Sequence, residues 1–296
     1  MAFEGFDTHL IDVGDARLFV RSGGKGPPLL LLHGYPQTHM IWHDVALRLA
    51  DRFHLVIADL RGYGRSTGPQ PDAEGHLYSK RAMAADLAAL MSALGHQRFS
   101  VAGHDRGGRV AYRLALDHPQ RVDRLCVLDI VPTSEMWGRM NHAGALRSYH
   151  WSFLAQPAPL PERLIGNDPD FFFETSLVGW GKTELKTFDP EMLAEYRRCW
   201  RDPAAIHGMV SDYRAAATID LAHDAAGIDR QVACPTLAFW GTAGAMHRLF
   251  DMKAEWQKRC ANVETATLPG GHFFVDQFPE ETAQRLQEFL AQVRSP

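Results

Sequence analysis

The sequence has few cysteines, and their spacing fits neither a disulfide framework nor a zinc site. The 296 residues include four cysteines, which form no CxxC pair. Small secreted domains and structural zinc sites need closely spaced cysteines. We therefore expect reduced, mostly buried thiols, no bound metal and a cytoplasmic protein. The four positions are Cys126, Cys199, Cys234 and Cys260.

Long apolar runs and an excess of basic charge are also absent. No segment approaches the roughly 20 apolar residues of a membrane-spanning helix. The start of the chain, MAFEGFDTHLIDVGDARLF, has acids where a signal peptide has a basic start and an apolar stretch. With 31 basic and 35 acidic residues the net charge is -4, which does not favour nucleic acid or a membrane as a partner. Any site for an anion must therefore be built locally.

Short apolar segments alternate with helical patterns along much of the chain. Continuous apolar runs of this length are typical of strands that are covered on both faces. The sequence therefore predicts an α/β fold with a doubly wound, mostly parallel sheet, which binds ligands at the carboxyl ends of its strands. The expected elements are a hairpin at 8–13 and 16–21, strands at 29–34, 54–60, 99–103, 124–130, 234–241 and 263–268, and helices at 79–94 and 106–117.

The alternation stops between about residues 132 and 220. That segment is rich in aromatic residues and prolines and contains no convincing strand pattern. The simplest interpretation is a helical cap at 132–220, inserted between two parts of the core at 1–131 and 221–296. Such a cap would lie over the site and exclude water.

The most informative residue is Asp105, in the run VAGHDRGGR. An apolar run precedes it, a helical pattern follows it, and Gly103 and Gly107 flank it. This is the Gly-x-nucleophile-x-Gly elbow, which normally holds serine. A GxDxG sequence by itself is more often a surface turn, so its meaning depends on the other motifs. A carboxylate nucleophile is suited to displacing a leaving group from an sp3 carbon, which forms an ester that water then cleaves.

Two further loops support the elbow. HGYP directly follows four leucines, and in this arrangement the backbone N–H groups of Tyr35 and Arg106 form an oxyanion hole. PGGHF follows the last expected strand, and its glycines allow the loop to present His272. HGYP could also be an ordinary turn, and most of the fifteen histidines are expected to be surface or packing residues. Their positions in the chain nevertheless match a nucleophile, acid and histidine order.

The acid is chosen by elimination between two strand ends. The loop after CPTLAFW reads GTAG and offers no carboxylate, whereas Asp129 comes directly after RLCVL. We therefore expect Asp129 to orient His272, although an aspartate that ends a strand can also cap the next segment.

Arg106 and Arg109 lie within about one helical turn of Asp105. A guanidinium beside the nucleophile makes it less reactive unless the cation is needed for another anion. A short substrate acid would bring its carboxylate to about 4 Å from Asp105, a repulsion of about 4 kcal/mol at an effective dielectric of 20. The two arginines would offset it, although pairing within the protein is the alternative. Arg113, about 10 Å further along the helix axis, is expected to form a structural ion pair.

At these residues the sequence resembles the haloacetate dehalogenases of the α/β-hydrolase superfamily, specifically the fluoroacetate dehalogenase type. The resemblance implies an α/β-hydrolase fold with a cap, and conversion of fluoroacetate or chloroacetate to glycolate and halide. Asp105 would displace the halide, His272 and Asp129 would activate water, and Arg106 and Arg109 would hold the substrate carboxylate. The motifs that carry it include HGYPQTHMIWH, AGHDRGGRVAYRLALDHP, YHWSFLAQPAPLPE, SDYRAAATIDL and LPGGHFFVDQFPE.

The resemblance also implies a halide site made by His150, Trp151 and Tyr213. Fluoride is small and strongly hydrated, so several N–H and O–H donors must replace its water as charge develops. Without the resemblance, each of the three would be interpreted as a packing residue. Trp180 is a further candidate for lining the pocket. Tyr35 stands where the family has Phe. A homodimer and the absence of any cofactor are implied as well.

Two other functions stay open. An epoxide hydrolase shares the fold and the aspartate nucleophile and uses cap tyrosines, for which Tyr149, Tyr196 and Tyr213 are available. A neutral epoxide, however, gives no reason for Arg106 and Arg109. The other alternative is a non-catalytic receptor with this fold, which the intact nucleophile, acid and histidine disfavour.

Overall fold

The computed structural model describes residues 3–180 and 183–292, and these contain one eight-stranded sheet. The strand order is β1-β2-β4-β3-β5-β6-β7-β8. β2 runs antiparallel to β1 and β4, and all other neighbouring pairs are parallel. This confirms the predicted fold class. The strands are β1 (Asp7–Asp12), β2 (Arg17–Gly24), β3 (Pro28–Leu32), β4 (His54–Ala58), β5 (Phe99–His104), β6 (Val122–Leu128), β7 (Thr236–Gly241) and β8 (Val263–Leu268).

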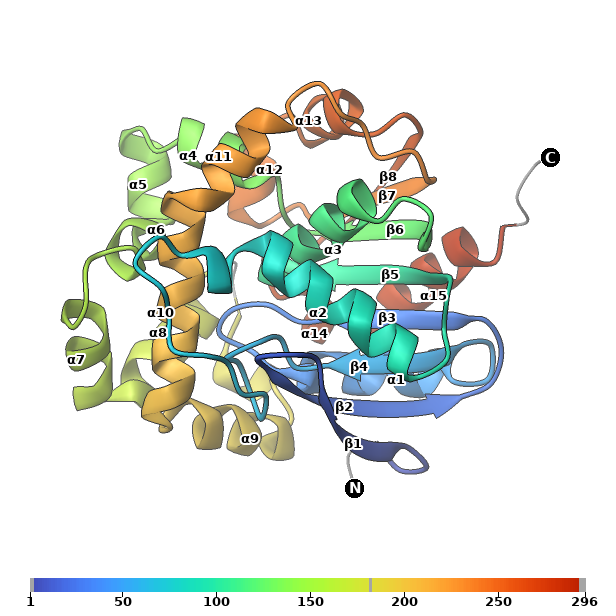
Figure 1. Ribbon diagram of the computed structural model, residues 1–296, viewed down its shortest axis with the longest axis horizontal. Helices are drawn as coiled ribbons and strands as arrows, with labels where there is room; N and C mark the ends of the chain where they lie inside the picture. Colours follow the sequence, from blue (N-terminus) through green and yellow to red (C-terminus); the bar gives the residue numbers. More distant parts are fainter. Residues whose placement is uncertain (1–2, 181–182, 293–296) are drawn as a thin grey trace.

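Helices cover both faces of the sheet, which explains the continuous apolar runs. In Figure 1, α2 (Lys80–Ala93) and α3 (Asp105–Asp117) lie in front of the strands, and α1 (His43–Leu49) and α15 (Pro279–Leu290) lie behind them. The four leucines of β3 are consequently fully buried. The core also includes the short helices α12 (Ala245–Leu249), α13 (Met252–Arg259) and α14 (Phe274–Gln277), and the 3-10 helices η1 (His39–Trp42) and η2 (His76–Tyr78).

Helices alone follow β6 until β7 begins, as far as the structure describes this part of the chain. Figure 1 shows them gathered mostly at one side of the sheet. Several begin with proline in their first turn, after an aspartate that caps the free backbone N–H groups. They are α4 (Thr133–Gly138), α5 (His142–Arg147), α6 (Tyr149–Leu154), α7 (Leu160–Asn167), α8 (Pro169–Gly179), η3 (Leu185–Thr187), α9 (Pro190–Trp200), α10 (Pro203–Ala217) and α11 (Ile219–Ala226).

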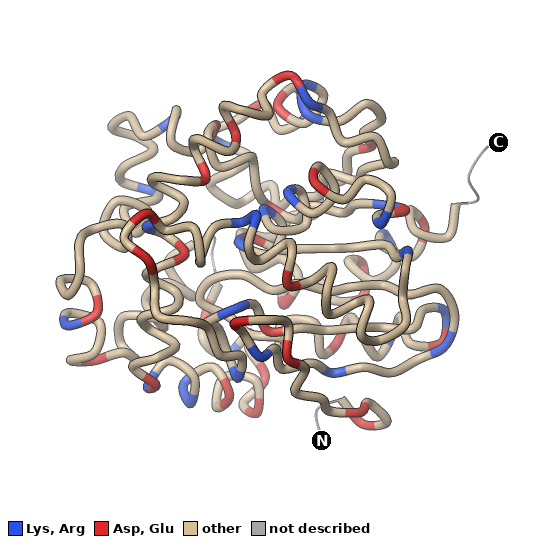
Figure 2. Tube along the Cα trace, in the orientation of Figure 1, with Lys and Arg blue, Asp and Glu red and all other residues tan. Residues whose placement is uncertain are grey.

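Charged residues are distributed over the whole molecule. Figure 2 shows acidic and basic positions interspersed along the described trace, in agreement with the small net charge of -4. Among the described helices, none combines the length and the apolar character needed to cross a membrane.

Candidate active site

Asp105 lies at the sharp turn between β5 and α3. Its φ is +47°, in the left-handed region that few residues with side chains adopt. The flanking glycines make the turn possible. A Cβ on Gly103 would lie 2.3 Å from the carbonyl oxygen of Gly107, and one on Gly107 would lie 2.2 Å from that of His33. The structure thus has the geometry of the predicted elbow.

The two carboxylate oxygens of Asp105 have different surroundings. Oδ1 accepts a hydrogen bond from the backbone N–H of Tyr35 at 2.8 Å. Oδ2 lies 3.6 Å from Nη1 of Arg109 and 3.7 Å from Nε2 of His272. Burial acts to raise the pKa of Asp105, but the charges of His272, Arg109 and Arg106 outweigh it and lower this pKa to about 2. Asp105 is therefore ionised, with Oδ2 facing the other predicted catalytic groups.

The buried imidazole of His33 connects the loop that contains Tyr35 to the segment after β4. Nε2 of His33 accepts a hydrogen bond from the backbone N–H of Leu60 at 3.0 Å. The ring proton is therefore on Nδ1, which donates to the carbonyl of Gly34 at 3.0 Å. A Cβ on Gly34 would lie 2.4 Å from that of Asp105 and 2.7 Å from the backbone N of Arg106. Loop and elbow are therefore in direct backbone contact.

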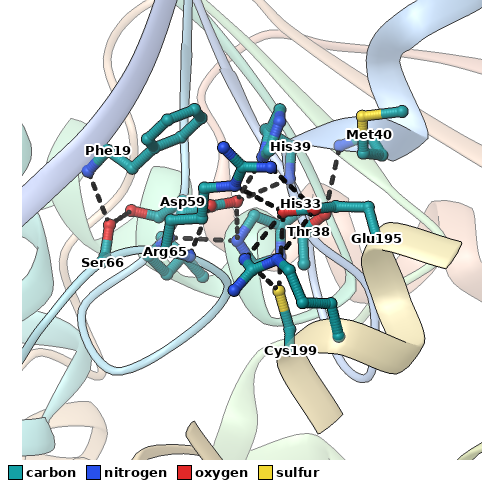
Figure 3. A network of polar contacts seen from close by, with 12 residues as sticks. Phe19, His33, Thr38, His39, Met40, Asp59, Arg65, Ser66, Glu195 and Cys199 are labelled. Atoms are coloured by element: carbon teal, nitrogen blue, oxygen red, sulfur yellow. Dashed lines mark hydrogen bonds and ion pairs between the residues drawn. The ribbon is translucent and has the colours of Figure 1, made fainter. Parts of the chain in front are cut away.

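Asp59, at the end of β4, fixes the far end of the same loop (Figure 3). Its Oδ1 accepts from the backbone N–H of His39 at 2.7 Å, and its Oδ2 from that of Arg65 at 2.9 Å. Burial acts to raise the pKa of Asp59, but the contacts with His39 outweigh it and lower the pKa to about 2. Arg65 in turn forms a two-pronged ion pair with Glu195 of α9, at 2.7 and 2.8 Å. This network connects the loop after β3 to α9, one of the helices beyond β6.

His272 and Asp129 meet as the motifs predicted. Nδ1 of His272 lies 2.7 Å from Oδ2 of Asp129, whose Oδ1 accepts from the backbone N–H of Gly241 at 3.2 Å. When the ring is neutral, its proton lies on Nδ1, and Nε2 faces Asp105 as the free base. Burial acts to lower the pKa of His272, but the hydrogen bond and charge of Asp129 outweigh it, so this pKa lies above 6.5. The geometry is that of a base held by a carboxylate.

His104, the residue before the nucleophile, has a supporting position. Burial lowers its pKa to about 3, so the ring is neutral and its Nε2 donates to the backbone carbonyl of His272 at 2.8 Å. Arg113 forms the expected structural ion pair, with both prongs on Asp117 at 2.7 Å.

The two predicted substrate-binding arginines differ in their partners. Arg109 is buried, and within the described chain its Nε and Nη1 have no hydrogen-bond partner. Burial lowers its pKa to about 10, so it remains a cation at neutral pH. Arg106 instead donates from Nε and Nη2 to the carboxylate of Asp212, at 2.7 and 2.8 Å. The sequence analysis did not predict this role of Asp212. The remaining guanidinium nitrogen of Arg106, Nη1, has no hydrogen-bond partner among the described residues.

The three predicted halide donors come together on two helices. His150 and Trp151 lie on α6, and their ring centroids are 5.8 and 5.5 Å from that of Tyr213 on α10. Burial lowers the pKa of His150 to about 3 and raises that of Tyr213, so both are neutral. Nδ1 of His150 and Oη of Tyr213 are buried without a hydrogen-bond partner in the part of the chain that the structure describes. Burying such polar atoms costs free energy unless a ligand forms hydrogen bonds with them.

A cavity of about 450 Å³ opens onto these groups. Trp180 helps to line it, with its ring centroid 4.1 Å from that of His150 and 5.9 Å from that of His272. Tyr35, Arg106 and Tyr213 are fully buried. The lining includes Asp105, Arg109, Asp129, His150, Trp151, Trp180 and His272, and further out Leu146, Arg147, Tyr149 and Arg248.

Comparison with known proteins gives the family. A model of the alpha/beta hydrolase fold family matches residues 27–279. The chain belongs to this family. A fluoroacetate dehalogenase from Burkholderia sp is 54% identical to the hydrolase over 293 residues, which cover 99% of this chain and 96% of the relative. The resemblance in the motifs is thereby confirmed over the whole chain.

Two further comparisons place the hydrolase among its relatives. A soluble epoxide hydrolase from Corynebacterium sp. (strain C12) is 30% identical, with 97% of this chain and 98% of the relative covered. The crystal structure of ALR0039 from Nostoc sp PCC 7120 superimposes with a TM-score of 0.96 at 47% identity, and covers 98% of this chain and 100% of that one.

Proposed function

We propose that the protein is a haloacetate dehalogenase that hydrolyses the carbon–halide bond of fluoroacetate or chloroacetate. The observation that carries this proposal is an ionised Asp105 whose free oxygen lies 3.6 Å from the guanidinium of Arg109. A carboxylate nucleophile attacks sp3 carbon, and a buried cation beside it suits a substrate with its own negative charge. The relative named fluoroacetate dehalogenase supports the same activity.

In the first step, Oδ2 of Asp105 attacks the α-carbon of the haloacetate. The new C–O bond forms as the carbon–halogen bond breaks, and halide leaves with the bonding electron pair. Arg109 and Nη1 of Arg106 hold the substrate carboxylate, which would otherwise repel Asp105 by about 4 kcal/mol at 4 Å and an effective dielectric of 20. Asp105 then carries a carboxymethyl ester.

The departing halide is received by neutral donors. Oη of Tyr213 and Nδ1 of His150 are buried without partners among the described residues, and the indole of Trp151 lies beside them. Such fixed donors replace the water shell that a small anion would have in solution, and they act as its charge develops. A neutral imidazole contributes one N–H, so this role places the proton of His150 on Nδ1.

In the second step, His272 removes a proton from water. The hydroxide adds to Cγ of the Asp105 ester, and the negative charge that forms on Oδ1 is stabilised by the backbone N–H of Tyr35, already 2.8 Å away. Collapse breaks the Cγ–Oδ2 bond, and the imidazolium of His272 returns its proton to the departing oxygen, which releases glycolate. The proton of the added hydroxide then passes from Asp105 to solvent, which restores the carboxylate. Asp129 stabilises the imidazolium of His272 meanwhile.

Parallel incubations test this function. Fluoroacetate, chloroacetate and styrene oxide are each given to the protein, and free halide, glycolate and diol are measured. We expect halide and glycolate in equal amounts from a haloacetate. Diol without halide would contradict the proposal and favour an epoxide hydrolase, which has support in the 30% identical relative. Neither turnover nor a covalent adduct with any short haloacid would favour a receptor.

The three tyrosines of the epoxide hydrolase alternative have different surroundings. Tyr149 lines the cavity but is 45% exposed, and Tyr213 is fully buried, with its ring beside those of His150 and Trp151. The hydroxyl of Tyr196 instead accepts a hydrogen bond from the side chain of Gln37 at 3.1 Å. An epoxide also leaves the cation of Arg109 without a role. The haloacetate is therefore the better-supported substrate.

A further inference from the structure

Arg106 is part of a buried charge cluster that extends away from the active site. Asp212 accepts hydrogen bonds from two nitrogens of Arg106. It also pairs with Nζ of Lys80 and accepts a hydrogen bond from the hydroxyl of Tyr63 at 2.7 Å. Lys80 lies in addition 3.6 Å from a carboxylate oxygen of Asp220, whose other oxygen accepts from the Lys80 backbone N–H at 2.8 Å. All five side chains are buried.

The charges of this cluster compensate one another. Arg106 and Lys80 contribute two cations, and Asp212 and Asp220 two carboxylates. Burial acts to raise the pKa of Asp212, but Arg106 and Lys80 outweigh it and hold the pKa far below its ordinary value. Asp212 is therefore ionised. Because Asp212 also contacts Lys80 and Tyr63, its negative charge stabilises three groups rather than Arg106 alone.

The two-pronged contact fixes the plane of the Arg106 guanidinium. Nε and Nη2 are both used by Asp212, so the planar fork can present only Nη1 elsewhere. Nη1 is buried and has no acceptor within the described chain. The guanidinium carbon also lies 4.1 Å from the ring centroid of Tyr213, the residue after Asp212. One turn of α10 thus holds both the arginine and a halide donor.

We propose that Asp212 is a positioning residue for substrate binding: it holds Arg106 away from Asp105 and aims Nη1 at the carboxylate of the haloacid. This inference rests on the proposed function. Without Asp212, Arg106, which directly follows the nucleophile in the chain, would be free to pair with Asp105. Such a pair would occupy the attacking oxygen and remove one contact from the substrate.

The test compares Asp212→Asn with Asp220→Asn. Both changes remove one negative charge from the same buried cluster, but Asp220 contacts Lys80 and not Arg106. We expect Asp212→Asn to raise KM for chloroacetate by about tenfold or more, the scale of one lost charge-assisted hydrogen bond. Asp220→Asn should change KM less than threefold. Melting temperatures of both variants report the structural cost separately.

A double-mutant cycle tests whether Asp212 acts through Arg106. In an Arg106→Met background, Asp212→Asn should change KM by less than twofold further. Equal increases of KM in Asp212→Asn and Asp220→Asn, in parallel with their losses of melting temperature, would overturn the proposal. If Asp212→Asn does not fold, KM of Asp212→Glu is compared with that of Asp220→Asn instead, because Asp212→Glu keeps the charge and moves the carboxylate by one methylene.

Calorimetric binding of acetate separates this proposal from the proposed function. Acetate has the carboxylate but no leaving group, so its affinity does not depend on turnover. We expect Asp212→Asn to weaken acetate binding by about tenfold and Asp220→Asn to leave it unchanged. Failure of the wild-type protein to release halide would remove the dehalogenase function, whereas identical acetate affinities in all three proteins would remove the role of Asp212.

Discussion

At the scale of single residues, the proposed mechanism gives the two oxygens of Asp105 different parts. Oδ1 is held by the backbone N–H of Tyr35, while Oδ2 is directed at Arg109 and His272. In that mechanism, attack through Oδ2 would leave the ester carbonyl on Oδ1, where the N–H group that would stabilise the next intermediate is already in place. The same contact would therefore serve both proposed steps.

Replacement of His272 by Asn should separate the two steps. The variant keeps Asp105 and the arginines but has no base for water, so one equivalent of halide should appear and the ester should persist. Mass spectrometry of the peptide that contains Asp105 should then show the added carboxymethyl group. The matched control is Asp105→Asn/His272→Asn, which should release no halide. Full turnover by His272→Asn would mean that another group activates the water.

Replacement of Asp129 by Asn should move the acid limb of the pH–rate profile. The imidazole of His272 must be neutral to accept a proton, so kcat should fall as the pH drops below its pKa, which Asp129 holds above 6.5. Without that carboxylate the imidazolium is less stable, and the limb should shift to lower pH, while kcat itself falls by about 10²-fold or more. An unshifted limb in Asp129→Asn would assign the titration to another group.

At the scale of elements, the site depends on backbone contact between the loop after β3 and the start of α3. A Cβ on Gly34 would lie within 2.7 Å of both the Asp105 side chain and the Arg106 backbone. Gly34→Ala should therefore displace the Tyr35 N–H and lower kcat by about 10²-fold, the size of one lost oxyanion donor. Gly166→Ala on α7 is the control, since its Cβ would meet nothing within 4 Å. Near-normal kcat in Gly34→Ala would show that the contact is dispensable.

Local sequence patterns predicted a strand well where its apolar run begins and ends with the extended backbone. β8 has the predicted bounds, 263–268. β6 ends at Leu128 rather than at residue 130, because Asp129 adopts a φ of +51° and turns out of the strand. That departure directs the Asp129 carboxylate toward His272. An apolar run alone carries no signal for such a turn.

Asp212 shows what local patterns leave out. Its partner Arg106 lies 106 positions earlier, so neither spacing nor periodicity connects the two. The sequence brought Arg106 to attention as a neighbour of the nucleophile, and it gave no sign that two of its nitrogens are already used. Asp105, Asp129 and His272 were predictable because their order along the chain is itself a pattern.

At the scale of the whole molecule, charge has to be organised locally, because the protein and its proposed substrate are both negative. Arg147 and Arg248 line the outer part of the cavity, are exposed, and have no carboxylate partner among the described residues. They would attract anions to the entrance. The homodimer and the cap boundaries that the sequence suggested stay predictions.

The salt dependence of the reaction tests this arrangement. We expect Arg147→Gln/Arg248→Gln to raise KM for chloroacetate by about two- to fivefold at low ionic strength, with kcat unchanged. The difference should shrink near 0.5 M salt, where the Debye length is only about 4 Å. Arg52→Gln, at the opposite edge of the sheet before β4, makes one charge change of the same kind and should have no effect. Equal salt profiles for all variants would remove the entrance arginines from substrate binding.

The fixed orientation of Asp105 also determines which of its oxygen atoms would be exchanged with water in each turnover. In the proposed mechanism water adds to Cγ and the Cγ–Oδ2 bond breaks, so each glycolate would leave with an oxygen that belonged to the enzyme, and the water oxygen would remain in Asp105. As long as the Tyr35 N–H prevents the carboxylate from rotating, the retained oxygen is always the same atom. In heavy-oxygen water the enzyme would then become labelled once, one turnover before its product, and its second oxygen would keep the original isotope.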